Sequence, residues 1–146
     1  MRWFLGPPRS VVSQMNNFSG NYNIDDNMVS TISFHNNAIG VIDVSWVHRH
    51  GPNPLEIYGT EGYLGIDTSL NGPRVQIVSN LLAAGEIKGV INPSNLPTAM
   101  PSPMQQWVNA IKNGTTMEMN IHDGFYLTQL MEGCYTAARH GHEFTF

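Results

Sequence analysis

Two pairs of alternating histidines are the first residues of the chain whose spacing suggests ligand or metal chemistry. His48 and His50 flank Arg49, and His140 and His142 form the second pair. Alternate residues of a strand share a face, so two such pairs could in principle supply four nitrogen ligands to zinc. The second pair, however, lies past the end of an expected helix. We therefore expect no metal site and assign both pairs to solvent-exposed ends of a strand and a helix.

Three carboxylates within expected strands, and one cysteine, are the other candidates for catalysis. General acid–base work needs two groups at a defined spacing with perturbed pKa values, and Asp43, Glu56 and Asp67 show no such pairing in the sequence. Carboxylates of this kind more often lie on exposed strand faces or pair across strands. Cys134 falls on the apolar side of a helical pattern, which favours a buried small hydrophobic residue over a nucleophile. We predict no catalytic residue in this chain.

Dinucleotide binding would need a glycine-rich turn between a strand and a helix. The two glycine-containing stretches, residues 59–62 and 85–89, have neither the G-x-G-x-x-G spacing nor that context. We therefore expect no cofactor-binding residue here.

The first two-thirds of the chain has the alternating pattern of β-strands. In residues 28–36, Met28, Ile32 and Phe34 point one way, and the Asn36-Asn37 turn joins this strand to the next, residues 39–48. Further strands are expected over residues 10–19, 55–59, 63–67 and 75–79, while residues 82–100 have no clear period and indicate a loop.

The last third changes to a helical period. Ser102 is a suitable N-cap for a helix that ends at Asn113-Gly114. A second helix is expected over residues 121–140, with Asn120 as its cap, Asp123 in the capping-box position and Gly141 as its stop. Its expected apolar stripe consists of Leu127, Leu130, Met131, Cys134 and Ala138. Strands followed by helices predict the α+β class.

The predicted architecture is an open, predominantly antiparallel β-sheet with helices on one face. Two helices cover one side only, and strand residues 39–48 are apolar on both faces. The other face is therefore available for oligomerisation.

Composition limits the partners of the chain. Its 146 residues suit one domain. The net charge of −4 and the scattered basic residues argue against nucleic acid. No apolar run is long enough for a membrane span, and a single cysteine suits a reducing cytoplasm.

Four segments, in order along the chain, resemble the C-terminal domain of the Gfo/Idh/MocA family of NAD(P)-dependent oxidoreductases. They are MRWFLGPPRSV at residues 1–11, LEIYGTEGYL at 55–64, QWVNAIKNG at 106–114, and a final helix that begins HDG and ends AARHG, at 122–141. The resemblance implies a sugar or polyol substrate and NAD or NADP as the cofactor of the parent enzyme. The family's Rossmann domain, its catalytic lysine in a Glu-Lys-Pro motif and its Asp/His pair have no counterpart in this sequence.

The resemblance also implies roles for this chain. Residues 1–146 would be a single substrate-side and oligomerisation domain, a fragment of a two-domain oxidoreductase whose N-terminal Rossmann half is missing, and inactive when isolated. Substrate binding would fall to His48, Arg49 and His50 at a strand end, and the partner would be another copy through the open sheet face. The alternatives are a free-standing, non-catalytic ligand-binding or interaction module and a small metal-dependent hydrolase that uses His48 and His50.

Overall fold

A computed structural model gives the structure of the chain and describes residues 1–49, 54–67, 74–79, 89–91 and 97–146. Its contacts divide the chain into two compact units. The first unit contains Met1–His48 and Ser102–Phe146, and the second contains Arg49–Pro101. The single substrate-side domain expected over residues 1–146 stays a prediction.

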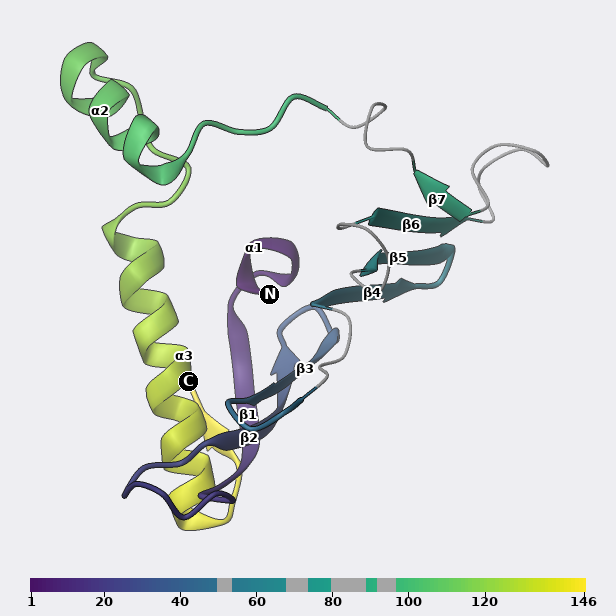
Figure 1. The fold of residues 1–146 in the computed structure, drawn as a ribbon, viewed down its shortest axis with the longest axis vertical. Coiled ribbons are helices and arrows are strands. Elements are labelled where there is room, and N and C mark those ends of the chain that lie inside the picture. Colours follow the sequence, from purple (N-terminus) through teal and green to yellow (C-terminus); the bar gives the residue numbers. More distant parts are fainter. Residues whose placement is uncertain (50–53, 68–73, 80–88, 92–96) are drawn as a thin grey trace. The chain divides into compact units, whose positions relative to one another are not determined.

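The first unit is built on a four-stranded antiparallel sheet with the strand order β3-β2-β1-β8 (Figure 1). The predicted hairpin is confirmed, and Asn37 at its turn has a φ of 65°. The third strand ends at Ser45, earlier than residue 48, although the backbone N–H of Trp46 still donates to the carbonyl of Asp26 in the same register. The strands are β1 (Pro8–Asn16), β2 (Asn27–Phe34), β3 (Ile39–Ser45) and β8 (Phe144–Thr145).

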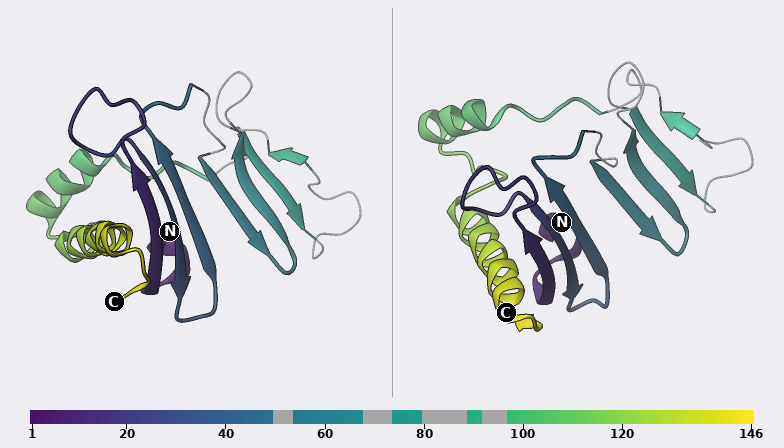
Figure 2. Two further views of the ribbon diagram at one scale, coloured as in Figure 1. Left: turned by 90° about the horizontal axis from the view of Figure 1, so that it is seen from below. Right: turned by 60° about the horizontal axis from the view of Figure 1, so that its bottom comes forward.

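Helix α3 (Ile121–His140) packs along β1 on one face of this sheet (Figure 2). The predicted Asn120 and Asp123 capping box is present at its start, and Gly141 ends it in the left-handed conformation. The buried core consists of Val11, Ile32, Phe34, Leu130, Cys134 and Ala137. Helix α3 buries Leu130, Gly133, Cys134 and Ala137, which is a slightly different set from the apolar stripe predicted from its sequence. Leu127 and Met131 are more than half exposed.

Two shorter helices complete the first unit. Helix α2 (Pro103–Asn113) has the predicted caps, since the Ser102 hydroxyl accepts from the N–H of Gln105 and Gly114 takes a left-handed conformation. Helix α1 (Arg2–Leu5) was not expected, because four residues are too few to show a period. Among the described residues, no helix has the length and apolar character needed to cross a membrane.

The second unit is a separate antiparallel meander with the order β4-β5-β6-β7. The strands expected over residues 55–59 and 63–67 form an antiparallel hairpin through residues 60–62, as predicted, and the strand expected at 75–79 is β6. The loop expected over 82–100 contains one short strand that the sequence analysis missed, since three residues show no alternation. The strands are β4 (Leu55–Gly59), β5 (Gly62–Asp67), β6 (Arg74–Ser79) and β7 (Gly89–Ile91).

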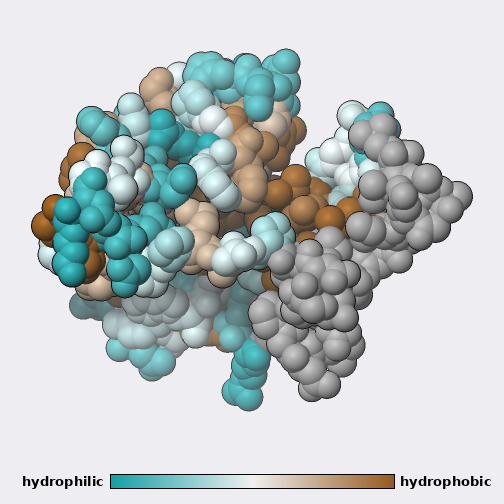
Figure 3. Space-filling model, turned by 90° about the horizontal axis from the view of Figure 1, so that it is seen from above, coloured by the Kyte–Doolittle hydropathy of each residue, from teal (hydrophilic) through white to brown (hydrophobic). Residues whose placement is uncertain are grey.

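These two sheets and their helices confirm the α+β class. All the described strand pairs are antiparallel, and each sheet is open. In the first unit, α3 covers one face of the sheet. Hydrophobic atoms reach the surface of the molecule in several places on the face seen in Figure 3.

Candidate functional site

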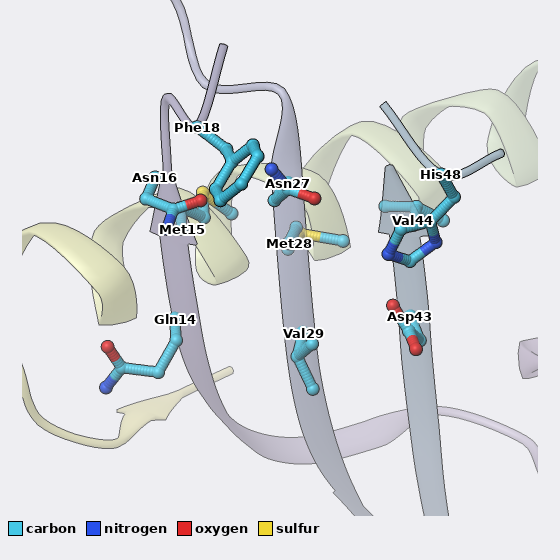
Figure 4. Close-up of a pocket in the computed structure, with 10 residues that line it drawn as sticks. All are labelled: Gln14, Met15, Asn16, Phe18, Asn27, Met28, Val29, Asp43, Val44 and His48. Atoms are coloured by element: carbon cyan, nitrogen blue, oxygen red, sulfur yellow. The ribbon is translucent and has the colours of Figure 1, made fainter. Parts of the chain in front are cut away.

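A groove of about 400 Å³ lies at one end of the first sheet, where β1, β2 and β3 and the segments that follow β1 and β3 meet (Figure 4). Its walls combine polar side chains with methionine, valine and phenylalanine. Ten residues line it: Gln14, Met15, Asn16, Phe18, Asn27, Met28, Val29, Asp43, Val44 and His48.

Strand register explains why the polar residues gather there. Gln14 pairs with Val29, which pairs with Asp43, so these three form one row across the sheet. Because alternate residues share a face, Asn16 and Asn27 continue the polar surface two residues further along β1 and β2. Both rows lie on the face opposite Met28 and Ile32, whose side of the sheet packs against the core.

A buried carboxylate organises the loop beside the groove. Asp26 is 4% exposed, and its two oxygens accept hydrogen bonds from the N–H of Phe18 at 2.7 Å and the N–H of Ser19 at 2.9 Å. The Tyr22 hydroxyl also donates to it at 3.4 Å, and the Asn27 side-chain amide donates at 2.8 Å. Residues 17–25 are thereby folded back onto the start of β2.

These contacts also set the ionisation of Asp26. Burial would raise its pKa, but the hydrogen bonds from Phe18, Ser19 and Tyr22 outweigh that effect and lower the pKa from 3.8 to about 2. Asp26 is therefore an anion at neutral pH. Its carboxylate accepts hydrogen bonds from the loop and does not line the groove.

The three residues predicted to bind substrate have different positions. His48 lines the groove, and Figure 4 shows its imidazole over β3 with the Asp43 carboxylate below it. Arg49 is exposed and does not line the groove, and His50 lies outside the described residues. Sequence analysis missed Gln14, Asn16 and Asn27. Strand alternation combined with the pairing register is the signal that would have found them.

The remaining residues considered for catalysis or metal binding make contacts within the fold or lie outside the described part of the structure. Glu56 accepts hydrogen bonds from the hydroxyls of Tyr58 and Tyr63 on its own sheet, and the side chain of Asp67 lies outside the described part of the structure. Cys134 is a buried free thiol, as predicted. The rings of His140 and His142 stack with their centroids 5.6 Å apart, but the described residues hold no cluster of three or more metal-ligating side chains.

A dinucleotide does not fit the described part of this chain. Pyrophosphate is bound at a helix N-terminus that follows a strand of a parallel sheet, whereas every described strand pair here is antiparallel. The N-terminus of α3 is already occupied by its capping box, in which the Asp123 carboxylate accepts from the N–H of Asn120. That negative charge would repel a phosphate. We derive no chemical step through a nicotinamide bound to these residues.

Apolar side chains occupy the rest of the open sheet face. Val12, Thr31 and Val41 form the next row beyond the groove. Val12 is 47% exposed and Val41 60% exposed, and Ile39 further along β3 is 71% exposed. The open face thus has a polar end with the groove and an apolar end without a covering element among the described residues.

One family model matches part of the sequence of this chain. The family model described as the GFO/IDH/MocA C-terminal domain matches residues 1–65. A search among curated proteins finds no significant match.

Solved structures share the fold over nearly the whole chain. One is an oxidoreductase from Agrobacterium radiobacter in complex with NAD+, L-tartaric acid and magnesium. It is 18% identical, with a TM-score of 0.74, and the match covers 99% of this chain and 45% of the oxidoreductase. The aldose-aldose oxidoreductase from Caulobacter crescentus complexed with glycerol is also 18% identical, with a TM-score of 0.79 and coverage of 99% and 43%. An NAD-binding protein from Listeria innocua is 17% identical, with a TM-score of 0.72 and coverage of 96% and 46%.

At these identities the structures establish the fold, and this chain spans less than half the length of each of them. The match to the family model lies in the sequence itself and includes β1, β2 and β3, the strands that carry the groove. Residues 1–65 are therefore similar in sequence to the GFO/IDH/MocA C-terminal domain, and the chain as a whole shares the fold of these oxidoreductases.

Proposed function

We propose that this chain is the substrate-side and subunit-contact domain of an NAD(P)-dependent sugar or polyol oxidoreductase, and that it is inactive by itself. The observation that carries the proposal is the family match over residues 1–65, on a chain whose fold corresponds to less than half of larger oxidoreductases. Proteins of this fold have been solved with NAD+ and with glycerol. The nicotinamide would be held by a separate Rossmann domain, whose absence from these residues explains the expected inactivity.

The substrate side of the proposal rests on the groove and the strand end beside it. His48 contributes an imidazole to the groove, and Arg49 follows it in sequence with an exposed guanidinium. Both groups are suited to hydrogen-bond hydroxyls. We assign substrate contact to His48, Arg49 and His50.

The subunit contact would use the apolar end of the open sheet face. Val12, Ile39 and Val41 are each about half exposed or more, and covering them with a second copy would remove apolar surface from water. A Val41→Lys variant is expected to weaken self-association by at least tenfold, because a symmetric contact would bury the new charge in both copies.

Val44→Lys is the matched control for that variant. Val44 lies on the same strand and is 50% exposed, but its register with Met28 places it on the opposite side of the sheet. Sedimentation velocity at micromolar concentration distinguishes them: association lost in Val41→Lys and kept in Val44→Lys supports the contact. Equal effects of both substitutions, or none, would refute it.

The oxidoreductase part is tested by adding the nucleotide domain. The purified chain is expected to show no NAD(P) binding and no turnover of sugars or polyols, and activity is expected only with a Rossmann domain that carries the glycine-rich turn and the Glu-Lys-Pro lysine. Turnover by the chain alone would contradict the assignment. Ligand binding without turnover in either case would favour a free-standing, non-catalytic module instead. A cytoplasmic location, supported by the free buried thiol of Cys134, completes the proposal.

A further inference from the structure

Four of the five polar side chains that line the groove have no partner among the described residues, the exception being Asn27, which donates to Asp26. Gln14, Asn16, Asp43 and His48 make no side-chain hydrogen bond or ion pair with any other residue that the structure describes, although all four line the same groove (Figure 4). Polar groups that converge without partners are the usual fixed elements of a small-molecule site. Two amides and an imidazole offer both donors and acceptors, and the carboxylate offers acceptors.

The charge of the groove restricts the chemistry of a ligand. Asp43 is the one acidic side chain among the lining residues, and neither lysine nor arginine is among them. The groove itself therefore disfavours phosphates and carboxylates, since these would meet a like charge there, and the Arg49 guanidinium is not among the lining groups. A neutral molecule with several hydroxyls can donate to Asp43 and exchange hydrogen bonds with Gln14 and Asn16, while the apolar side chains of Phe18 and Val29 accommodate its C–H groups.

The backbone that carries the Phe18 wall of the groove is held in place before any ligand arrives. Phe18 lies at the rim, between the ends of β1 and β2 (Figure 4), and its own N–H is tied to Asp26. The Asp26 bond to Ser19 and the edge-on contact of Tyr22 with Trp46, at 6.0 Å between ring centroids, hold the rest of the loop. A preorganised wall lowers the ordering cost of binding.

We propose that this groove is a preorganised binding site for a neutral, hydroxyl-rich molecule, and that Asp26 is the positioning residue that sets its Phe18 wall. The inference rests on the proposed function and deepens it, because it assigns the sugar-like substrate to the polar end of the open sheet face and selects neutral sugars over sugar acids. It also separates the ligand site from the apolar end of the same face, where Val12, Ile39 and Val41 lie.

Glucose and glucuronate are a suitable pair of probes, because they differ by the oxidation of one carbon. In an NMR titration of the full 146-residue chain at low salt, glucose is expected to shift the side-chain amide signals of Gln14, Asn16 and Asn27 with a roughly millimolar dissociation constant. Glucuronate should bind about fourfold more weakly, the effect of two like charges some 5 Å apart in a water-like dielectric. Asp43→Asn should remove that difference. No shift with either sugar, tighter binding of glucuronate, or a preference unchanged in Asp43→Asn would overturn the assignment.

The positioning role has its own matched pair of variants, Asp26→Asn and Asp25→Asn. They remove the same charge from adjacent residues, but Asp25 accepts from the Tyr135 hydroxyl at 3.3 Å, whereas the N–H groups of Phe18 and Ser19 donate to Asp26. Asp26→Asn is expected to lower the hydrogen-exchange protection of the Phe18 and Ser19 amides at least tenfold, with α3 amides unchanged, and to weaken glucose binding several-fold. Asp25→Asn should do neither.

A purely structural role for Asp26 would lower protection in the loop and in α3 alike, and that result would overturn the positioning role. Should Asp26→Asn fail to fold, Tyr22→Phe removes one donor to Asp26 with a smaller perturbation. It is expected to lower Phe18 and Ser19 protection by a few-fold, and no change would count against the proposal. None of these measurements needs NAD(P), a second domain or self-association. A failure of the groove is therefore distinguishable from a failure of the oxidoreductase assignment.

Discussion

Replacing Gly133 with alanine tests how α3 closes the covered face of the sheet. Gly133 is buried in the middle of α3, and a Cβ built there would lie 2.8 Å from two ring atoms of Phe146 and 3.0 Å from Cδ1 of Phe144. The two rings pack edge to face with centroids 5.3 Å apart. The N–H of Phe146 donates to the carbonyl of Arg9 at 3.0 Å, so the end of the chain is held in place.

Two opposing effects decide the magnitude. Alanine favours a helix over glycine by about 0.5–1 kcal/mol, whereas a methyl group forced into packed rings costs about 1–3 kcal/mol. Gly124 lies in the same helix, and a Cβ there meets no atom within 4 Å. Gly124→Ala therefore gains only the stabilisation that comes from the higher helix propensity of alanine. The gain in helix propensity is shared by both variants and cancels when they are compared. The free energy of unfolding of Gly133→Ala should therefore be lower than that of Gly124→Ala by about 1–3 kcal/mol.

Urea denaturation followed by far-ultraviolet circular dichroism measures both free energies of unfolding, provided that the transition is two-state. In a Phe146→Ala background, which removes the closest ring, the gap between the two glycine variants should shrink. Equal stability of Gly133→Ala and Gly124→Ala, or greater stability of the former, would refute the packing of the C-terminal rings on α3.

Three further predictions concern the same unit. The buried hydroxyls of Ser13 and Ser30 hydrogen-bond at 2.6 Å, so Ser13→Ala alone should lower the free energy of unfolding by about 1–3 kcal/mol, and the double alanine variant should be less destabilised than additivity predicts. Asn120→Ala should cost about 1 kcal/mol in the same denaturation assay, because the N–H of His122 loses its acceptor at the start of α3. Since the folded pKa of Asp26 is lowered to about 2, its contribution to stability is fully present above pH 4 and is lost as the pH falls toward about 2; pH-dependent unfolding should show this loss in the natural chain and less of it in Asp26→Asn.

Most of the secondary structure could be predicted from short-range features of the sequence. The caps at Ser102, Asn120 and Gly141 depend on neighbouring residues only, and each is present as predicted. The stripe of α3 is different, because the side that it buries depends on where β1 and the C-terminal rings lie. Leu127 has the right period to be buried and is 59% exposed.

The groove could be predicted only in part. His48 stood out by its type and its place at the end of a strand, but Gln14, Asn16 and Asn27 are ordinary strand residues until the register of β1 on β2 is known. Asp26 shows no motif either. Its role depends on a loop that returns to it from Phe18 and Ser19, and such a return is invisible in a linear pattern.

The open face of the first sheet is the centre of this account, since it is proposed to carry both the subunit contact and the substrate side. The most direct test is the mass of the purified chain in solution, measured by sedimentation at micromolar concentration. The expected species has at least twice the 16.2 kDa mass of one chain and dissociates in Val41→Lys. A strict monomer across the micromolar range would contradict this expectation.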